Sequence, residues 1–523
     1  MHSHRSWAPL LLLGGGLALS APQLSAQQPS ATEDALRQRV EELEQKLQRL
    51  EERLGQQPAP SASDAQPAQS AGEPSPREQA LQQRVEELDQ QVKVLGRKQE
   101  LQQEEQDAAK KSSPIVTAAE SGLTVRSPDG LGSFRLRGLL QTDGRLFTDS
   151  AGGTDTFLLR RVRPIFEGTL GGIYDFRFTP DFASGRAVIQ DAYLHARFKP
   201  YAQLRVGKFK EPVGLERLQG GADIRFVERA YPTNVLPNRD IGLQLSGELL
   251  DSRIEYQVGY FNGVVDGRSS EDFTNEQDNN ADKDWATRVF AHPFRDGVGP
   301  LQGLGIGVAA TYVSAGGRSG TTVQETSLPS YRSIAQQVFF SYRTGATNGT
   351  FADGERMRLS PQAYWYWRSL GVIAEYALVS QDVRRNPAPG TTLAATLDHA
   401  AWQVAATYVL TGEDNSFRGI KPREPFQLGK PGWGAFEVGA RYTQLELDDD
   451  TFSGGASSFA DPTASARSAK TWGAVLNWYL NANVRLVVDY ENTAFEWGGG
   501  GTAAAPLDRP DEELVFVRFQ TAF

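Results

Sequence analysis

Apolar residues recur at two different spacings along the chain, one in an N-terminal part and the other in a longer C-terminal part. Within residues 33–54, apolar residues recur at alternating spacings of four and three, and the same spacing returns within 81–95. Such a seam predicts two short α-helical coiled-coil segments. The seam residues are Leu36, Val40, Leu43, Leu47, Leu50 and Leu54 in the first segment, and Leu81, Val85, Leu88, Val92 and Leu95 in the second.

Residues 55–76, which separate the two segments, are rich in Pro, Ala, Ser and Gln and are predicted to form a linker. Each segment holds about three heptads, which is marginal for an isolated helix. We therefore expect residues 27–111 to gain stability from an oligomer built elsewhere in the chain. Pairing of the two segments within one chain, as a helical hairpin, is the alternative.

From residue 132 to residue 523 the pattern changes to period two, after a second linker at 112–131. In 192–199, for example, Ala, Leu, Ala and Phe alternate with Tyr, His, Arg and Lys. Segments of about ten residues with one apolar and one polar face are typical of a transmembrane β-barrel. The predicted fold is therefore all-β, an antiparallel transmembrane β-barrel preceded by an α-helical coiled coil.

Strand counting predicts sixteen barrel strands when segment 334–344 is assigned to a long external loop, since single-chain bacterial barrels have even strand numbers. Most short connections then fall on one side and most long ones on the other, as in barrels with short periplasmic turns and long outer loops. Long connections are expected at 211–240 and at 383–398, among others. The connection 412–432 is the exception, because it is long yet lies on the periplasmic side. Both chain ends are periplasmic in this arrangement.

Composition narrows the class of protein further. The chain has 523 residues, a formal net charge of −10 and no cysteine, which excludes disulfides and thiolate chemistry. Residues 1–26 contain one basic residue at Arg5, an apolar run and a small-residue ending, so they are predicted to be a secretory signal peptide. No later apolar stretch is long enough for a transmembrane helix. Export without disulfides suits a bacterial envelope protein.

Positive charge is concentrated in the first five predicted strands. Residues 132–210 hold 13 Lys and Arg against 7 Asp and Glu, although the whole chain is acidic. Arginine facing lipid at the bilayer midplane costs roughly 2–4 kcal/mol, so the polar face of these strands is expected to line the lumen. The arginines on that face are Arg135, Arg137, Arg161, Arg163, Arg177, Arg197 and Arg205, and Lys208 lies near the end of the fifth strand.

The segment 211–240 follows the last basic strand and contains Gly, Pro and mixed charge. We expect it to fold into the barrel and narrow it, with Arg217 at the constriction. A narrow pore concentrates the field of such charges, and a guanidinium matches carboxylate or phosphate oxygens. The alternative is that the basic side chains only balance lumen carboxylates and give weak selectivity.

The barrel region, about residues 132–523, resembles the phosphate-selective porins O and P. The resemblance rests on an ordered set of short motifs. They are Leu159-Arg160-Arg161, Asp191-Ala192-Tyr193, Gly207-Lys208-Phe209, Gly214-Leu215-Glu216, Glu228-Arg229, Arg239-Asp240-Ile241-Gly242, Tyr260-Phe261-Asn262-Gly263, Phe436-Glu437-Val438, Asn477-Trp478-Tyr479-Leu480-Asn481 and the closing Phe523.

The resemblance implies a trimeric, 16-stranded outer-membrane channel with an inward third loop and a ladder of arginines leading to the constriction. It implies that Arg160 and Arg161 match a paired-arginine position of that ladder, and that Arg217 stands where phosphate-specific members place a loop lysine. The sequence departs from those members at Leu139, Ala222 and Gln190. These departures bear on how strict any phosphate specificity is. The coiled coil adds a trimer clamp to this picture.

Other classes of protein have less support. A barrel hydrolase needs a nucleophile beside a base, and the histidines that follow the signal peptide, His195, His292 and His399, lie in no recognisable serine motif. We find no phosphate-binding loop, zinc spacing or dinucleotide fingerprint, and no support for nucleic-acid binding. We expect neither an enzyme nor a bound cofactor or metal. A structural tether, with the barrel as membrane anchor and the coiled coil reaching other envelope layers, remains an alternative.

The predicted function is a passive outer-membrane channel for small anions, such as phosphate or polyphosphate. The expected pathway residues are Arg135, Arg137, Arg160, Arg161, Arg163, Arg177, Arg197, Arg205, Lys208 and Arg217. The expected partners are the anions, outer-membrane lipid and two further copies of the chain, with the coiled coil in the periplasm. A general, weakly selective porin is the nearest alternative.

Overall fold

The computed structural model describes residues 76–148, 153–272 and 282–523, together with isolated helical positions between 38 and 52. It divides into two compact units, 1–113 and 114–523. The predicted signal peptide and the first apolar seam, from Leu36 to Leu54, lie outside the described residues. No helix in the described part of the chain is long and apolar enough to cross a membrane.

The first unit contains helix α2 (Pro76–Ser112), which is longer than the predicted second seam. Val85, Leu88 and Leu95 of that seam are half-buried, whereas Val94, between seam positions, is 68% exposed. An ion pair at 2.6 Å joins Asp89 to Lys93 one turn later, an arrangement that supports a solvated helix. The structure confirms a helix over the second seam, and its pairing as a coiled coil stays a prediction.

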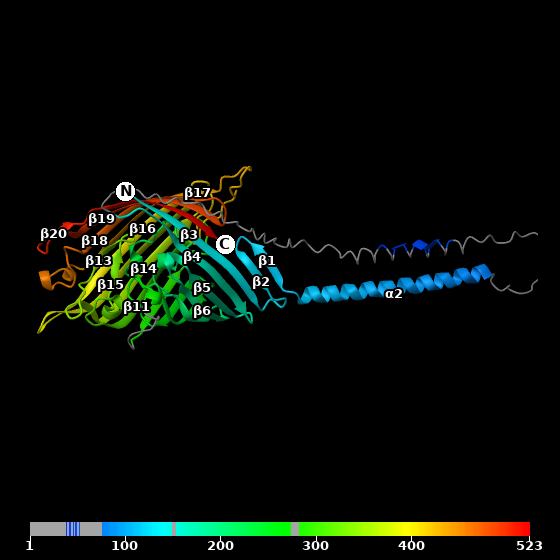
Figure 1. The fold of residues 1–523 in the computed structure, drawn as a ribbon, viewed down its shortest axis with the longest axis horizontal. Coiled ribbons are helices and arrows are strands. Elements are labelled where there is room, and N and C mark those ends of the chain that lie inside the picture. Colours follow the sequence, from blue (N-terminus) through cyan, green and yellow to red (C-terminus); the bar gives the residue numbers. More distant parts are fainter. Residues whose placement is uncertain are drawn as a thin grey trace, which may run out of the picture. The chain divides into compact units, whose positions relative to one another are not determined.

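The second unit is a closed antiparallel barrel of 16 strands (Figure 1). Each strand pairs with the next, and β21 pairs with β3 to close the ring. The strands are β3 (Ser133–Phe147), β4 (Thr156–Leu170), β5 (Tyr174–Asp181), β6 (Val188–Lys199), β7 (Ala202–Lys210), β8 (Arg239–Leu249), β9 (Ile254–Phe261), β10 (Asp284–Ala291), β11 (Leu304–Gly316), β14 (Thr350–Trp367), β15 (Leu370–Ala388), β16 (Thr391–Val409), β17 (Ala435–Glu446), β18 (Ala466–Tyr479), β19 (Val484–Thr502) and β21 (Glu512–Ala522).

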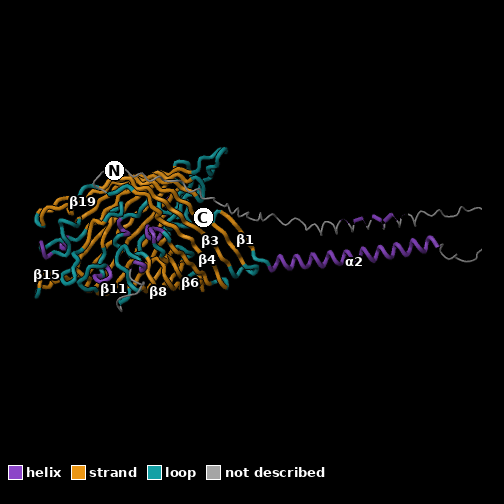
Figure 2. The backbone as a smooth tube through the Cα atoms, viewed as in Figure 1, coloured by secondary structure: helices purple, strands orange, loops and turns teal. Residues whose placement is uncertain are grey.

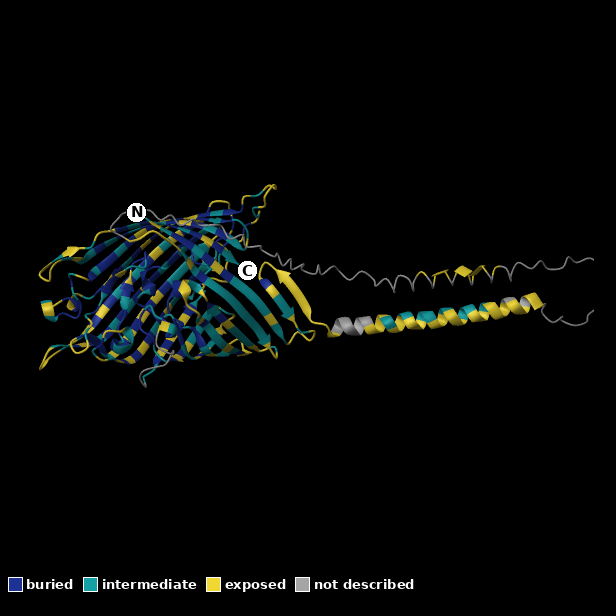
Figure 3. Cartoon of the chain, viewed as in Figure 1, coloured by how far each residue is buried: buried dark blue, intermediate teal, exposed yellow. Residues whose placement is uncertain are grey.

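The period-two pattern follows from this geometry, because successive side chains point to opposite faces of a strand. In β8, Gln244 is 2% exposed, while its neighbours Leu243 and Leu245 are 46% and 45% exposed. Figure 3 shows the same alternation of buried and exposed residues along many strands. Apolar side chains therefore face outward, where lipid would cover them, and polar side chains face inward.

Two parts of the barrel differ from the sequence-based expectation. Residues 112–131, expected to be a linker, contain the hairpin β1 (Ile115–Ala119) and β2 (Gly122–Arg126), and β2 pairs with the start of β3. Residues 383–398, expected to be a loop, instead continue strands β15 and β16 as a paired hairpin. These extensions add backbone hydrogen bonds at both ends of the wall. A further short strand, β20 (Ala505–Asp508), pairs with the end of β19.

Loops fill much of the barrel interior, and Figure 2 shows loop segments and short helices among the strands. The loop 211–238 contains the one-turn helix α3 (Leu215–Leu218). The loop 317–349 contains the one-turn helix α4 (Val323–Thr326) and the small sheet of β12 (Ser330–Arg332) and β13 (Val338–Ser341). Segment 334–344 is therefore not a barrel strand, in agreement with the strand count.

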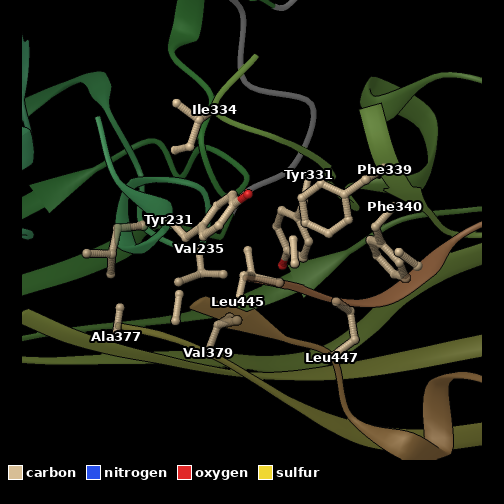
Figure 4. Close-up of a cluster of buried hydrophobic side chains, with 14 of the residues drawn as sticks. Tyr231, Val235, Tyr331, Ile334, Phe339, Phe340, Ala377, Val379, Leu445 and Leu447 are labelled. Carbon is tan, nitrogen blue, oxygen red and sulfur yellow. The ribbon is translucent and has the colours of Figure 1, made fainter. Parts of the chain in front are cut away.

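A buried apolar cluster holds these two loops against the wall (Figure 4). Tyr231 and Val235 of the first loop and Tyr331, Phe339 and Phe340 of the second belong to it. Strands β15 and β17 contribute wall residues, among them Ala377, Val379 and Leu445. The sequence predicts one inward loop, and the structure has a second that packs beside it. The barrel core is thus an apolar contact between the loops and the wall, to which strands from β7 to β21 contribute.

Candidate functional site

The loop 211–238 crosses the lumen because wall side chains bind its backbone at several points. The carboxylate of Glu375 on β15 accepts hydrogen bonds from the amides of Leu215 (2.6 Å) and Glu216 (3.3 Å). On β3, Gln141 donates from Nε2 to the carbonyl of Gly221 at 2.9 Å. These contacts fix the two sides of the loop to strands that are far apart around the ring.

The next part of the loop is attached to the last barrel strands. The amide of Val227 donates to Asp489 Oδ2 (2.7 Å), and its carbonyl accepts from Arg518 Nη1 (2.7 Å). Arg518 is itself held by Asp143, with contacts of 2.6 and 2.7 Å to the two carboxylate oxygens. Tyr231 forms a hydroxyl hydrogen bond of 2.8 Å to Thr471. Bonds between a rigid wall and loop backbone keep the loop in one position.

Between the loop and the wall formed by strands β4 to β8 lies a cavity of about 340 Å³. Strands β4 to β8, the segment 183–186, both inward loops and residues 266–272 contribute to the lining. Ten basic side chains and four acidic ones reach this cavity, so its lining is positively charged. The basic residues are Arg160, Arg161, Arg163, Arg186, Lys210, Arg217, Arg229, Arg239, Arg268 and Arg332, and the acidic ones are Asp181, Asp266, Glu271 and Asp272.

A β-bulge places two consecutive arginines inside the barrel. Gln141 of β3 pairs with Arg161 and Thr142 pairs with Leu159, so Arg160 is the extra residue on β4. An extra residue breaks the alternation of side chains locally. Arg160 and Arg161 therefore both line the cavity, although strict alternation would send one of them toward lipid.

Three arginines of the cavity have carboxylate partners. Arg160 contacts both oxygens of Glu228, at 2.6 and 3.0 Å. Arg163 lies 2.7 Å from Asp181 Oδ2. Arg239 lies 2.9 Å from Asp191 Oδ1. These pairs shape the wall, and much of their charge is already neutralised.

The other seven basic residues of the cavity form no salt bridge among the described residues, and four of these seven lie on strands β4 and β7 and on the loop 211–238. Arg161 donates to the side-chain oxygen of Gln141, and Arg217 donates to the carbonyl of Thr233. Lys210 and Arg229 donate to the same carbonyl, that of Gln219, at 2.7 and 2.9 Å. We call Arg161, Lys210, Arg217 and Arg229 the open cations. Carbonyl and amide oxygens carry no full charge, so these cations can attract an anion.

Burial disfavours the protonated, charged form of Arg217 and Arg229, the two open cations of the loop. Burial and the neighbouring Arg229 and Arg239 lower the pKa of Arg217 to about 9. Burial lowers the pKa of Arg229 to about 10, although Glu216 counteracts it. Both guanidinium groups therefore stay protonated at neutral pH. An oxyanion beside them would lower the cost of holding two buried positive charges together.

The structure separates the predicted pathway residues into groups. Arg160, Arg161, Arg163 and Arg217 line the cavity described above. Arg135 and Arg177 line a second cavity, of about 360 Å³, at the end of the barrel where β2 pairs with β3. Both of these arginines form salt bridges with Glu167 there.

The remaining predicted residues lie in other surroundings. Arg137 also pairs with Glu167, at 3.6 Å, and Arg197 pairs with Asp175 at 2.7 Å. The guanidinium of Arg205 lies over the ring of Tyr193, 4.8 Å from its centroid, and Lys208 pairs with Glu271 at 2.8 Å. None of these four residues lines either cavity.

Several cavity residues were missing from the predicted pathway. Lys210 and Arg229 are open cations, and Arg186, Arg268 and Arg332 also reach the cavity. Lys210 ends the same basic strand as Lys208, so the excess of positive charge up to residue 210 was the available signal. The three other arginines lie in connecting segments, where no periodicity indicates which way a side chain points.

The three departures from the phosphate-specific pattern lie close to this cavity. Gln190 is the extra residue of a second bulge, on β6, and its side-chain oxygen accepts from Arg163 at 3.2 Å. Leu139 lies beside Gly221, since a Cβ added at Gly221 would be 3.3 Å from the Leu139 side chain. The carbonyl of Ala222 accepts from Gln520 at 3.1 Å. Neutral residues thus stand at all three positions.

Solved structures of other barrels resemble this chain at low sequence identity. OmpT of Vibrio cholerae, folded in vitro, gives a TM-score of 0.44 at 12% identity, over 75% of this chain and 98% of that one. The outer-membrane channel DcaP of Acinetobacter baumannii gives 0.43 at 11% identity, over 78% and 99%. An anion-selective porin from Comamonas acidovorans gives 0.44 at 11% identity, over 75% and 100%.

No curated protein matches the chain. A family model does match, and it covers residues 134–522, which is almost the whole barrel. The model describes phosphate-selective porins O and P. The match includes the strands, the inward loops and the bulged arginine pair that the structure brings together. The chain belongs to the family of phosphate-selective porins O and P.

Proposed function

We propose that this outer-membrane porin is an anion-selective diffusion channel that takes phosphate-sized oxyanions. Its family and its barrel make it an outer-membrane channel. The selectivity is proposed on one observation, which is the basic cavity with four open cations beside the inward loop. Anions would enter from outside, meet Arg217 and Arg229, and pass Arg161 toward the cavity near Arg135 and Arg177.

The physical argument rests on charge in a confined space. A narrow passage with walls of low dielectric constant strengthens the field of fixed charges. Four open cations, each held by neutral oxygens, offer weak neighbouring sites. Conduction needs binding that is favourable enough for entry and weak enough for exit, and several adjacent sites satisfy both conditions. Arginine also presents a planar fork that fits phosphate oxygens.

We also propose that the chain is a homotrimer, that lipid surrounds its apolar outer face, and that helix α2 lies in the periplasm. Support for an assembly comes from the apolar seam of α2, with Val85, Leu88, Val92 and Leu95 along one face. A single helix with such a seam is expected to pair with copies of itself. Polyphosphate is a further candidate ion, since it repeats the same phosphate chemistry.

Planar-bilayer recording of the purified full chain tests the proposed selectivity. We expect the reversal potential across a KCl gradient to show anion preference, and added phosphate to reduce the chloride current. Cation preference would overturn the proposal. Anion preference without any phosphate effect would leave a general anion channel. A barrel that does not conduct would favour the structural tether.

A further inference from the structure

A segment from the periplasmic side rises into the barrel opposite the basic cavity. This segment, 410–434, joins β16 to β17 and is the long connection that broke the rule of short periplasmic turns. Its residue Asn415 is 6% exposed and donates to Thr407 Oγ1 on the wall at 2.8 Å. The carbonyl of Glu413 accepts from Ser369 Oγ at 3.0 Å. Residues 413–417 are therefore bound against the inner wall of β14–β17.

The raised segment meets the inward loop, and Arg225 makes most of the connection. Its Nη2 donates to Asn415 Oδ1 at 2.9 Å and to the carbonyl of Ser416 at 2.7 Å. Its Nε contacts Glu437 Oε1 on the wall at 3.0 Å. Gln219 of the same loop donates to the carbonyl of Phe417 at 2.9 Å. We call Gln219, Arg225, Asn415, Ser416 and Phe417 the latch.

Little space remains on the latch side of the inward loop. The cavity between the loop and strands β14–β16 measures about 20 Å³, which is room for about one water molecule. The cavity on the basic side is about 340 Å³. The ring of Phe417 also stacks on Tyr364 of β14, with centroids 5.2 Å apart. Among the described residues, the larger space beside the loop therefore lies on its basic side.

Three carboxylates lie in or beside the small cavity, and Arg225 is the basic residue that lines it. Glu216 lines the small cavity, Glu375 binds the loop backbone beside it, and Glu437 holds Arg225. All three carboxylates are almost fully buried. Without the charge of Arg225, Glu216 would be the charged residue left in the lining and Glu437 would lose its partner, so a passage on this side would attract cations.

We infer that the latch is a selectivity determinant, because it closes an acidic second route through the barrel and confines ions to the basic cavity. The inference rests on the proposed anion selectivity. Arg225 and Asn415 do not line the basic cavity, so they act as positioning residues and not as part of the anion site. The ion selectivity of the channel would then depend on two features. One is the positive charge of the basic cavity, and the other is the closure of the route beside the latch.

Single-channel recording of Arg225→Gln and Asn415→Ala, beside the unaltered protein, tests this inference. We expect each variant to conduct more current and to shift the reversal potential toward cation permeation. The control is Lys421→Ala in the same periplasmic segment, because Lys421 is 74% exposed and pairs only with Glu120 among described residues. This control should leave both quantities unchanged. Higher conductance with unchanged anion preference would overturn the inference, as would unchanged conductance in both variants.

A labelling experiment reports on the second route without any ion flow. The chain has no cysteine, so Ala405→Cys, in the small cavity, introduces a single thiol. We expect a charged, water-soluble thiol reagent to spare this thiol when the latch is intact and to label it when Arg225→Gln is also present. Ala183→Cys in the basic cavity should react in both backgrounds. Equal labelling of Ala405→Cys in both backgrounds would overturn the inference that the latch closes this route.

The two proposals fail in different ways. If the unaltered protein lacks anion preference, the proposed function fails, and the inference about selectivity fails with it. In that case, conductance and labelling still show whether the latch closes a second route. If the unaltered protein prefers anions and the variants behave like it, only the inference about the latch fails.

Discussion

Arg160 and Glu228 form a two-point ion pair between the barrel wall and the inward loop, with N–O distances of 2.6 and 3.0 Å. Arg160 is the bulged residue of β4, and Glu228 lies 68 positions later in the chain. The same carboxylate also contacts Arg145 of β3 at 3.3 Å. One loop residue thus fixes the position of the constriction relative to two strands.

Loss of this carboxylate should weaken the barrel and change its response to acid. Burial alone would raise the pKa of Glu228, but Arg160, Arg518 and Arg145 hold it well below its usual value. A depressed pKa stabilises the fold above the unfolded-state pKa, and this contribution is lost as the pH falls toward the folded-state pKa. At pH 7 we expect Glu228→Gln to lower the free energy of unfolding by about 3 kcal/mol.

Heat-induced unfolding on SDS gels, from pH 7 down to about pH 3, measures this effect. The unaltered barrel should lose stability as the pH falls below about 4.5, the ordinary value for a glutamate. Glu228→Gln should start lower and change less over the same range. Glu248→Gln is the matched control, because Glu248 is exposed near the end of β8 and contacts only Ser252 among described side chains. Parallel pH curves for Glu228→Gln and the unaltered protein would contradict the prediction.

Arg161 and Arg197 should differ in their effect on selectivity, although both lie on the polar face of basic strands. Arg161 is an open cation of the basic cavity, whereas Arg197 is 44% exposed and paired with Asp175. Removing one lumen charge costs an anion about 1 kcal/mol of attraction, which corresponds to about a fivefold change in relative permeability. Arg161→Gln should therefore lower anion preference, and Arg197→Gln should leave it nearly unchanged. Reversal potentials in a KCl gradient measure both, and equal effects would contradict the assignment.

Gly221 allows the inward loop to approach the wall closely. A Cβ at this position would lie 3.3 Å from both Arg161 Cδ and Leu139 Cδ2. Gly221→Leu should therefore push the loop into the basic cavity, with an overpacking cost of about 1–3 kcal/mol, and lower the single-channel conductance. Gly316→Leu is the control, since a Cβ there meets nothing within 4 Å. Unchanged conductance in Gly221→Leu would show that the loop has room to move.

The proposed pairing of helix α2 between copies can be tested by cysteine cross-linking. Leu88 belongs to the apolar seam, and Val94 is exposed between seam positions. Because disulfides need Cα atoms about 4.4–6.8 Å apart, only a residue facing its counterpart in another chain cross-links readily. Leu88→Cys should give covalent dimers on mild oxidation, and Val94→Cys should give far fewer. Equal cross-linking at both positions would argue against a packed seam.

Local alternation predicted most of the barrel wall. The inward direction of Arg161 and Arg163, the even strand number and the exclusion of 334–344 all follow from period two and from parity. Strand ends were less predictable, because β15 and β16 continue by pairing with each other through 383–398. The sequence also predicted that segment 211–240 folds into the barrel, because it follows the basic strands.

The sequence by itself determined the alternating faces of the strands and the concentration of positive charge before residue 210, because both depend on neighbours along the chain. Only the tertiary structure decided that a bulge brings Arg160 inward beside Arg161, that Glu228 pairs with Arg160, and that Arg161 and Arg229 have no carboxylate partner among the described residues. It also decided that Arg225 joins the inward loop to the segment containing Asn415. These relationships depend on strand register and on contacts between distant segments, which no local pattern encodes.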